Sequence, residues 1–125
     1  MSYVALATQN FDEVTQFYRE VLGFDVVTEW DRPRGRGTRF DLGGGLRLEI
    51  LDNSREPVPR ALGEGGDRVH VVVEVDDVHA TWSQLSIDAP APAATSWGAS
   101  LFGIRDPDGT AITFLQWTTS EGSRR

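Results

Sequence analysis

The chain has 125 residues, a formal net charge of −7, no cysteine, and arginine at all 12 of its Lys/Arg positions. The lack of cysteine excludes disulfides, thiolate metal sites and a cysteine nucleophile, and the lack of lysine excludes Schiff-base chemistry and a P-loop. The acidic charge disfavours nucleic acid as a partner, and no segment has the roughly 20 apolar residues of a membrane span. We therefore expect one cytoplasmic domain (1–125) with no nucleic-acid or membrane partner.

The first predicted module covers residues 1–51. Alternating apolar residues predict a strand at 3–7, and helical spacing from Asn10 onward predicts a helix of about three turns. Asn10 and Glu13 have the spacing of a capping box, and Gly23 would end the helix in a left-handed conformation. Strands are then expected at 24–30, 38–42 and 46–51, separated by turns at 31–37 and 43–45.

Residues 52–68 are rich in proline and glycine and predict a connector. The second module, 69–117, begins with a β-branched strand at 70–75 and a shorter helix capped by Asp76 or Asp77. A weak strand is expected at 87–95, and the polar residues 118–125 read as a tail. Two further strands, 100–104 and 111–117, would flank a turn at Asp106–Gly109.

The same order of elements therefore occurs twice. It predicts an α+β fold of two pseudo-symmetric βαβββ modules. Superposing the two modules pairs Tyr3 with His70, and Glu49 with Thr113. Tyr3 and His70 thus occupy equivalent positions on the first strands of the two modules, and Glu49 and Thr113 occupy equivalent positions on the last strands.

Each predicted strand has two unlike faces, because side chains at i and i+2 lie on the same side. One face is apolar and should lie under the helices: Val4, Leu6, Leu48, Ile50, Val71, Val73, Val75, Ile112 and Phe114. The other face mixes small, polar and aromatic residues, as ligand pockets do. It holds Tyr3, Ala5, Arg47, Glu49, Leu51, His70, Val72, Glu74, Thr113, Leu115 and Trp117.

Three segments carry a resemblance to a known family: Phe17–Phe24, His70–Asp77 and Asp106–Gly109. They resemble the vicinal-oxygen-chelate superfamily, which includes glyoxalase I, extradiol dioxygenases, fosfomycin-resistance enzymes and bleomycin-binding proteins. The resemblance covers residues 3–117. It implies a curled, open eight-stranded barrel with a central cavity, and a homodimer.

The resemblance also implies where a metal ion would bind. Enzymes of the family place ligands at the positions that hold Tyr3, Glu49, His70 and Thr113 here. A His, His, Glu set would need histidine at positions 3 and 70 and glutamate at position 113, and this chain keeps only His70 of it. The glyoxalase-type pattern also uses a carboxylate at the position of Glu49, so the resemblance leaves His70 and Glu49 as the two good ligands. We expect no metal cofactor, with a weakly held divalent ion at His70 and Glu49 as the alternative.

The predicted ligand-binding residues combine this set with neighbouring side chains. Trp97 and Trp117 are suited to stack on a planar ligand. Arg32, Arg34 and Arg36 read as a solvated turn, and His79 as a solvated helix residue. The full predicted set is Tyr3, Arg47, Glu49, His70, Trp97, Phe102, Thr113 and Trp117.

Several functions are compatible with these residues. The first is a metal-independent protein that binds or sequesters a small molecule, as bleomycin-binding relatives do. The alternative is a metal-dependent lyase, isomerase or dioxygenase with an atypical site at His70 and Glu49. A third is metal-free acid–base catalysis, with His70 as base and Glu49 orienting it. A regulatory or partner-binding domain is the fourth.

Overall fold

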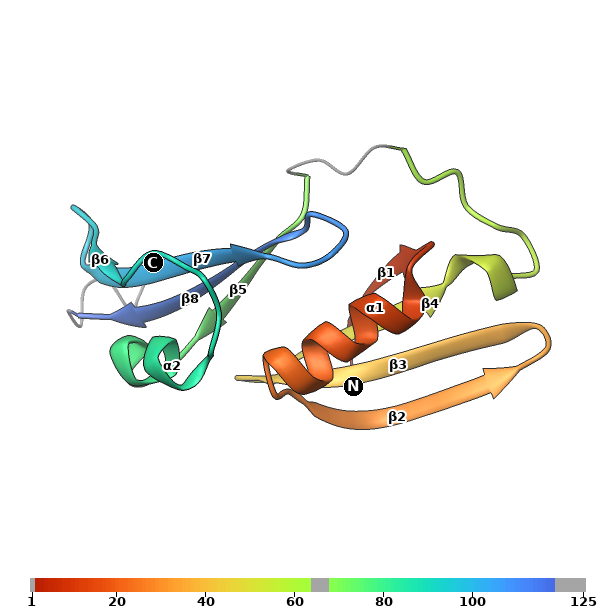
Figure 1. Ribbon diagram of the computed structural model, residues 1–125, viewed down its shortest axis with the longest axis horizontal. Coiled ribbons are helices and arrows are strands. Elements are labelled where there is room, and N and C mark those ends of the chain that lie inside the picture. The colour runs from red at the N-terminus through yellow and green to blue at the C-terminus, as the bar shows by residue number, and fades with distance from the viewer. Residues whose placement is uncertain (1, 64–67, 119–125) are drawn as a thin grey trace. The chain divides into compact units, whose positions relative to one another are not determined.

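The computed structural model describes residues 2–63 and 68–118 (Figure 1). The chain divides into two compact units. Unit 1 comprises the described residues up to 63 together with the turn Asp106–Gly109. Unit 2 comprises residues 68–105 and 110–118.

Unit 1 is one four-stranded sheet with a helix on one face (Figure 1). The strand order is β1-β4-β3-β2, with β1 parallel to β4 and the other pairs antiparallel. The elements are β1 (Val4–Thr8), α1 (Phe11–Gln16), the π-helical turn η1 (Phe17–Val21), β2 (Asp25–Arg32), β3 (Gly35–Gly43), β4 (Leu46–Asp52) and the 3₁₀ turn η2 (Asn53–Arg55).

The core of unit 1 lies between the helix and the sheet. Val14 and Tyr18 come from the helix, and Phe40, Leu48 and Ile50 come from β3 and β4; each is at most 1% exposed. Burying such large side chains supplies most of the driving force for folding. Val4, which we expected on this face, is 46% exposed because it begins the edge strand β1.

The sequence predicted the end of the helix correctly but not its N-terminal cap. Gly23 has φ +72 and the Phe24 amide donates to the Tyr18 carbonyl at 3.0 Å, which confirms the left-handed stop. The capping box is wrong, because Asn10 makes no side-chain cap. Its carboxamide instead donates to Asp108 Oδ1 at 3.0 Å.

The turn between β2 and β3 is shorter than the predicted 31–37. Ladder pairing continues through Asp31 with Arg36 and Arg32 with Gly35, so only two residues make the turn. Arg36 is therefore a strand residue, and its guanidinium lies 4.4 Å from the centre of the Phe11 ring. The prediction of a solvated arginine turn is wrong for Arg36, because cross-strand and helix partners hold it in place.

Unit 2 repeats the architecture of unit 1 (Figure 1). Its strand order is β5-β8-β7-β6, with β5 parallel to β8 and the rest antiparallel. Its elements are β5 (His70–Glu74), α2 (Val78–Gln84), β6 (Ala93–Ala94), β7 (Ala99–Arg105) and β8 (Ala111–Trp117). The identical order of strands and pairings confirms the α+β class and the two βαβββ modules.

Local sequence explains how the elements of unit 2 begin and end. Asp77 caps α2 by accepting from the Ala80 amide at 3.0 Å, as expected. Gly109 has φ +87 and its amide donates to the Asp106 carbonyl, which closes the predicted turn. The strand expected at 87–95 is reduced to β6, since Pro90 and Pro92 lack the N–H that ladder pairing requires.

Two parts of the expected domain plan reach beyond the described residues. The predicted connector, 52–68, contains 64–67, and the predicted tail, 118–125, contains 119–125; both stretches lie outside the description. The barrel and its central cavity stay predictions. No helix within 2–63 or 68–118 has the length and apolar character needed to cross a membrane.

Candidate functional site

Glu49 is buried in unit 1, with 5% of its surface exposed, and it is paired with Arg39. The two residues are directly opposite in the antiparallel pairing of β3 and β4. Arg39 Nε and Nη2 both donate to Glu49 Oε2, at 3.0 and 2.7 Å. Hydrogen bonding to Glu49 is the main cause of the raised pKa of Arg39.

Tyr3 covers the same guanidinium. The centre of its ring lies 4.0 Å from Arg39 Cζ, within the range of a cation–π contact. Tyr3 is 46% exposed, so this contact forms at the accessible side of the pair. Tyr3, Arg39 and Glu49 thus form one cluster on the face of the sheet opposite the helix, which we call the Glu49 face.

Trp30 belongs to the same face. It pairs in register with Gly37, which lies two residues before Arg39 on β3. Its indole covers Gly37, because a Cβ at that position would lie 2.8 Å from Trp30 Cε2 and closer still to Cζ2. The glycine therefore leaves the space that the half-buried ring fills.

In unit 2, His70 and Thr113 are in contact. His70 Nε2 and Thr113 Oγ1 are 2.6 Å apart, a short hydrogen bond whose donor depends on the tautomer of the ring. Gly103 pairs with Thr113 in register, so no side chain from β7 covers the hydroxyl. A pocket of about 250 Å³ includes both Gly103 and Thr113. The structure thus gives His70 a partner within its own sheet.

The two tryptophans predicted to stack on a ligand also lie together. The ring centres of Trp97 and Trp117 are 5.5 Å apart at an interplanar angle of 65°. Trp117 Nε1 donates to Glu74 Oε1 at 2.8 Å, which orients the indole. Phe102 is placed differently: it is 2% exposed and stacks on Phe114, on the opposite side of the sheet from Thr113.

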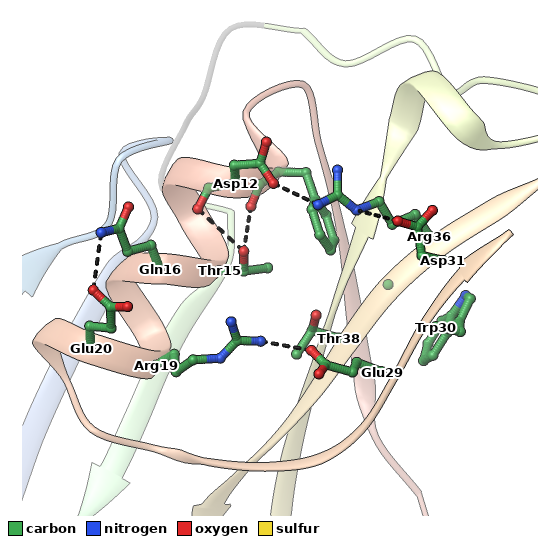
Figure 2. Close-up of a pocket in the computed structure, with 12 residues that line it drawn as sticks. Asp12, Thr15, Gln16, Arg19, Glu20, Glu29, Trp30, Asp31, Arg36 and Thr38 are labelled. Atoms are coloured by element: carbon green, nitrogen blue, oxygen red, sulfur yellow. Dashed lines mark hydrogen bonds and ion pairs between the residues drawn. The ribbon is translucent and has the colours of Figure 1, made fainter. Parts of the chain in front are cut away.

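Figure 2 shows a larger pocket of about 510 Å³ between α1 with η1 and the β2–β3 hairpin. Arg19 Nη2 lies 2.8 Å from Glu29 Oε2, and Arg36 Nη2 lies 2.7 Å from Asp12 Oδ1. Each ion pair joins the helix to the hairpin. Because these charged groups are engaged with each other, we interpret the pocket as an ion-paired seam and place the candidate site on the Glu49 face.

Comparison with known proteins identifies the family. The family model described as "Glyoxalase/Bleomycin resistance protein/Dioxygenase superfamily" matches residues 1–114. The chain belongs to this superfamily. The match spans most of both units, and it confirms the family expected from the sequence.

Individual relatives within the superfamily are distant. A lactoylglutathione lyase of Neisseria meningitidis is 25% identical over 97% of this chain and 93% of its own length. A glyoxalase/bleomycin resistance protein/dioxygenase from Nocardioides aligns with TM-score 0.72 at 21% identity, covering 95% and 83% of the two chains. TnmS3, an antibiotic-binding protein from Streptomyces sp. CB03234, aligns with TM-score 0.66 at 24% identity, covering 92% and 93%. At these identities the structural likeness shows the fold alone.

At the ligand positions that the family resemblance implies, the contacts within each unit fit a divalent ion poorly. At Glu49 an ion would have to displace the guanidinium from Oε2 and then lie beside it, against like-charge repulsion. Thr113 is a poor ligand and Tyr3 is engaged with Arg39. Within the described residues, no three His, Cys, Asp or Glu side chains gather closely enough to hold a metal ion.

Arg39 and Trp30 lie on the Glu49 face but were not among the ligand-binding residues predicted from the sequence. Equal spacing from the Gly44–Gly45 turn would pair Phe40 with Glu49, because residues equally distant from a hairpin turn tend to pair. A register shift between Asp41 and Gly43 moves the pairing by one residue and brings Arg39 opposite Glu49 instead. Arg47, which we did predict, lies half-buried on β4 two residues before Glu49 and on the same face.

Proposed function

We propose that this protein binds and sequesters a small molecule on its Glu49 face without a metal ion. The observation that carries the proposal is the Arg39–Glu49 pair. It occupies the one good carboxylate at the ligand positions that the family resemblance implies. The face nevertheless keeps aromatic and polar side chains of the kind that line ligand pockets.

Features of unit 2 support binding rather than structure alone. Trp97 is 39% exposed and its ring adjoins that of Trp117, so the two indoles offer aromatic surface to a planar ligand. Its partner Trp117 is oriented by Glu74. The antibiotic-binding protein TnmS3, which shares the fold, gives the same function a precedent within similar proteins.

Binding by protein treated with a chelator tests the proposal. We expect planar, drug-sized compounds from a broad panel to change tryptophan fluorescence saturably in the presence of EDTA. Trp30→Phe should weaken this binding, because Trp30 lies on the Glu49 face. Trp82→Phe is the matched control, because the Trp82 indole donates to the Ala89 carbonyl and belongs to α2. Binding that appears only after a divalent ion is added would contradict the proposal.

A second candidate is a metal-dependent lyase, isomerase or dioxygenase at His70 and Glu49. The similarity to lactoylglutathione lyases favours it. It requires Arg39 to leave Glu49 when the ion binds. Ion-dependent turnover that is lost in both His70→Ala and Glu49→Gln would support this candidate over the first.

Two further expectations belong to the proposal: that the protein is cytoplasmic and that it forms a homodimer. Sedimentation equilibrium of the purified chain tests the second. A mass twice that of the 13.8 kDa chain is expected, and a monomer at all concentrations would contradict it.

A further inference from the structure

The contacts that Arg39 makes with the described residues do not use all of its hydrogen-bond donors. A guanidinium carries five N–H groups in a rigid plane. Glu49 Oε2 accepts from Nε and Nη2, and Tyr3 both packs its ring against the guanidinium and hydrogen-bonds to it. Up to two N–H groups therefore remain for a ligand.

The guanidinium is also held in a fixed position. Its Nε and Nη2 groups both donate to one oxygen of Glu49, and the centre of the Tyr3 ring lies 4.0 Å from Arg39 Cζ. The side chains of Arg39 and Glu49 are 23% and 7% exposed, so water screens the pair only in part. A fixed, partly desolvated donor binds an acceptor more strongly than a mobile surface arginine does, because little further ordering is needed.

We propose that Arg39 is the cationic contact for the ligand, and that the ligand presents a planar carboxylate to it. This inference rests on the proposed function, since it assigns the chemistry of the same face. Arginine forks match carboxylates in geometry and in charge. Arg47 adds a second positive charge on this face. Glu49 is then a positioning residue that orients the guanidinium.

Two probes of equal shape and opposite charge test this inference. Sodium benzoate and benzamidine are titrated into ¹⁵N-labelled protein in EDTA, and the backbone amide signals of β3 and β4 are followed. We expect benzoate to shift the signals of Arg39 and Glu49 saturably, and benzamidine to leave them in place. Raising the salt concentration should weaken the benzoate response, because the contact is ionic.

Three variants locate the contact. The double variant Arg39→Gln/Glu49→Gln removes both charges and should bind benzoate about tenfold more weakly or worse. Glu49→Gln alone keeps the guanidinium and removes the competing carboxylate, so its affinity for benzoate should equal or exceed that of the native chain. Arg19→Gln is the matched control, because it breaks an arginine–glutamate pair on the helix side of the same unit and should change nothing.

The outcomes separate this inference from the proposed function. Undiminished benzoate binding by the double variant, no benzoate response at Arg39, or a preference for benzamidine overturns the assignment. Metal-free binding of other compounds would then leave the proposed function standing. A benzoate response that requires a divalent ion overturns both. If the double variant does not fold, Arg39→Lys replaces it, with about threefold weaker binding expected from loss of the fork.

Discussion

Arg39 and Glu49 face each other on neighbouring strands, and one carboxylate oxygen of Glu49 receives both the Nε and Nη2 donors of the guanidinium. The pair is neutral as a whole and lies at a position where the family resemblance implies a metal ligand. On our proposal, Arg39 occupies the carboxylate that a metal ion would need, and its guanidinium is the cation that the ligand contacts.

Removing only Arg39 should destabilise the fold. Arg39→Gln leaves the buried Glu49 without its cationic partner, and we expect a loss of about 1–3 kcal/mol in the free energy of unfolding, measured with urea. The double variant Arg39→Gln/Glu49→Gln should recover part of this loss, because no unpaired charge remains. A double variant less stable than the single one would contradict the role assigned to the pair.

Tyr18 should make the fold sensitive to alkaline pH. Burial, followed by the charge of Asp106 and the hydrogen bond to it, raises the pKa of Tyr18 far above its usual value. The folded state therefore favours the protonated phenol. Its contribution to stability is complete below the unfolded pKa of about 10 and is lost as the pH rises above that value.

The urea midpoint between pH 8 and 11.5 measures this effect. We expect the native chain to lose stability above about pH 10 more steeply than Tyr18→Phe does. At pH 8 the variant should be less stable by about 1–3 kcal/mol, because the buried Asp106 carboxylate loses the Tyr18 hydroxyl. Parallel pH curves for the two proteins would refute the explanation.

Gly37 should tolerate no side chain while Trp30 lies across it. We expect Gly37→Ala to displace the indole, to change the fluorescence of Trp30 and to cost about 1–3 kcal/mol. Gly63→Ala is the matched control, because a Cβ at Gly63 meets nothing within 4 Å. Equal stability of the two variants would show that the ring position inferred for Trp30 is wrong.

The hydrogen bond between His70 and Thr113 is open to NMR, since His70 and His79 are the only histidines of the chain. Thr113→Val should move the ring ¹⁵N signals of His70 and leave those of His79 unchanged. Thr113→Ser keeps the hydroxyl and should resemble the native spectrum. An unchanged His70 signal in Thr113→Val would exclude the contact in solution.

The sequence predicted those features that local patterns encode. Alternation and turn residues predicted both modules, the Asp77 cap and the left-handed Gly23, because each depends on neighbours in the chain. The capping role of Asn10 was wrong, since its carboxamide bonds to Asp108, 98 residues away. Contacts of this kind depend on tertiary packing, which no local pattern specifies.

The candidate site was predictable to a smaller extent. The repeat paired Tyr3 with His70 and Glu49 with Thr113, but the hydrogen-bond partners of these residues depend on side-chain geometry. The pairing of Arg39 with Glu49 depends on the irregularity between Asp41 and Gly43, which the turn residues alone do not specify. The position of Trp30 was not predictable either, because it depends on how its ring folds over a glycine on the next strand.

Binding of divalent ions to the purified protein tests the central claim most directly. Equilibrium dialysis against nickel, zinc and manganese should show no stoichiometric ion on the native chain, because Arg39 already holds the Glu49 carboxylate. One ion bound per chain, and lost in both Glu49→Gln and His70→Ala, would contradict the account.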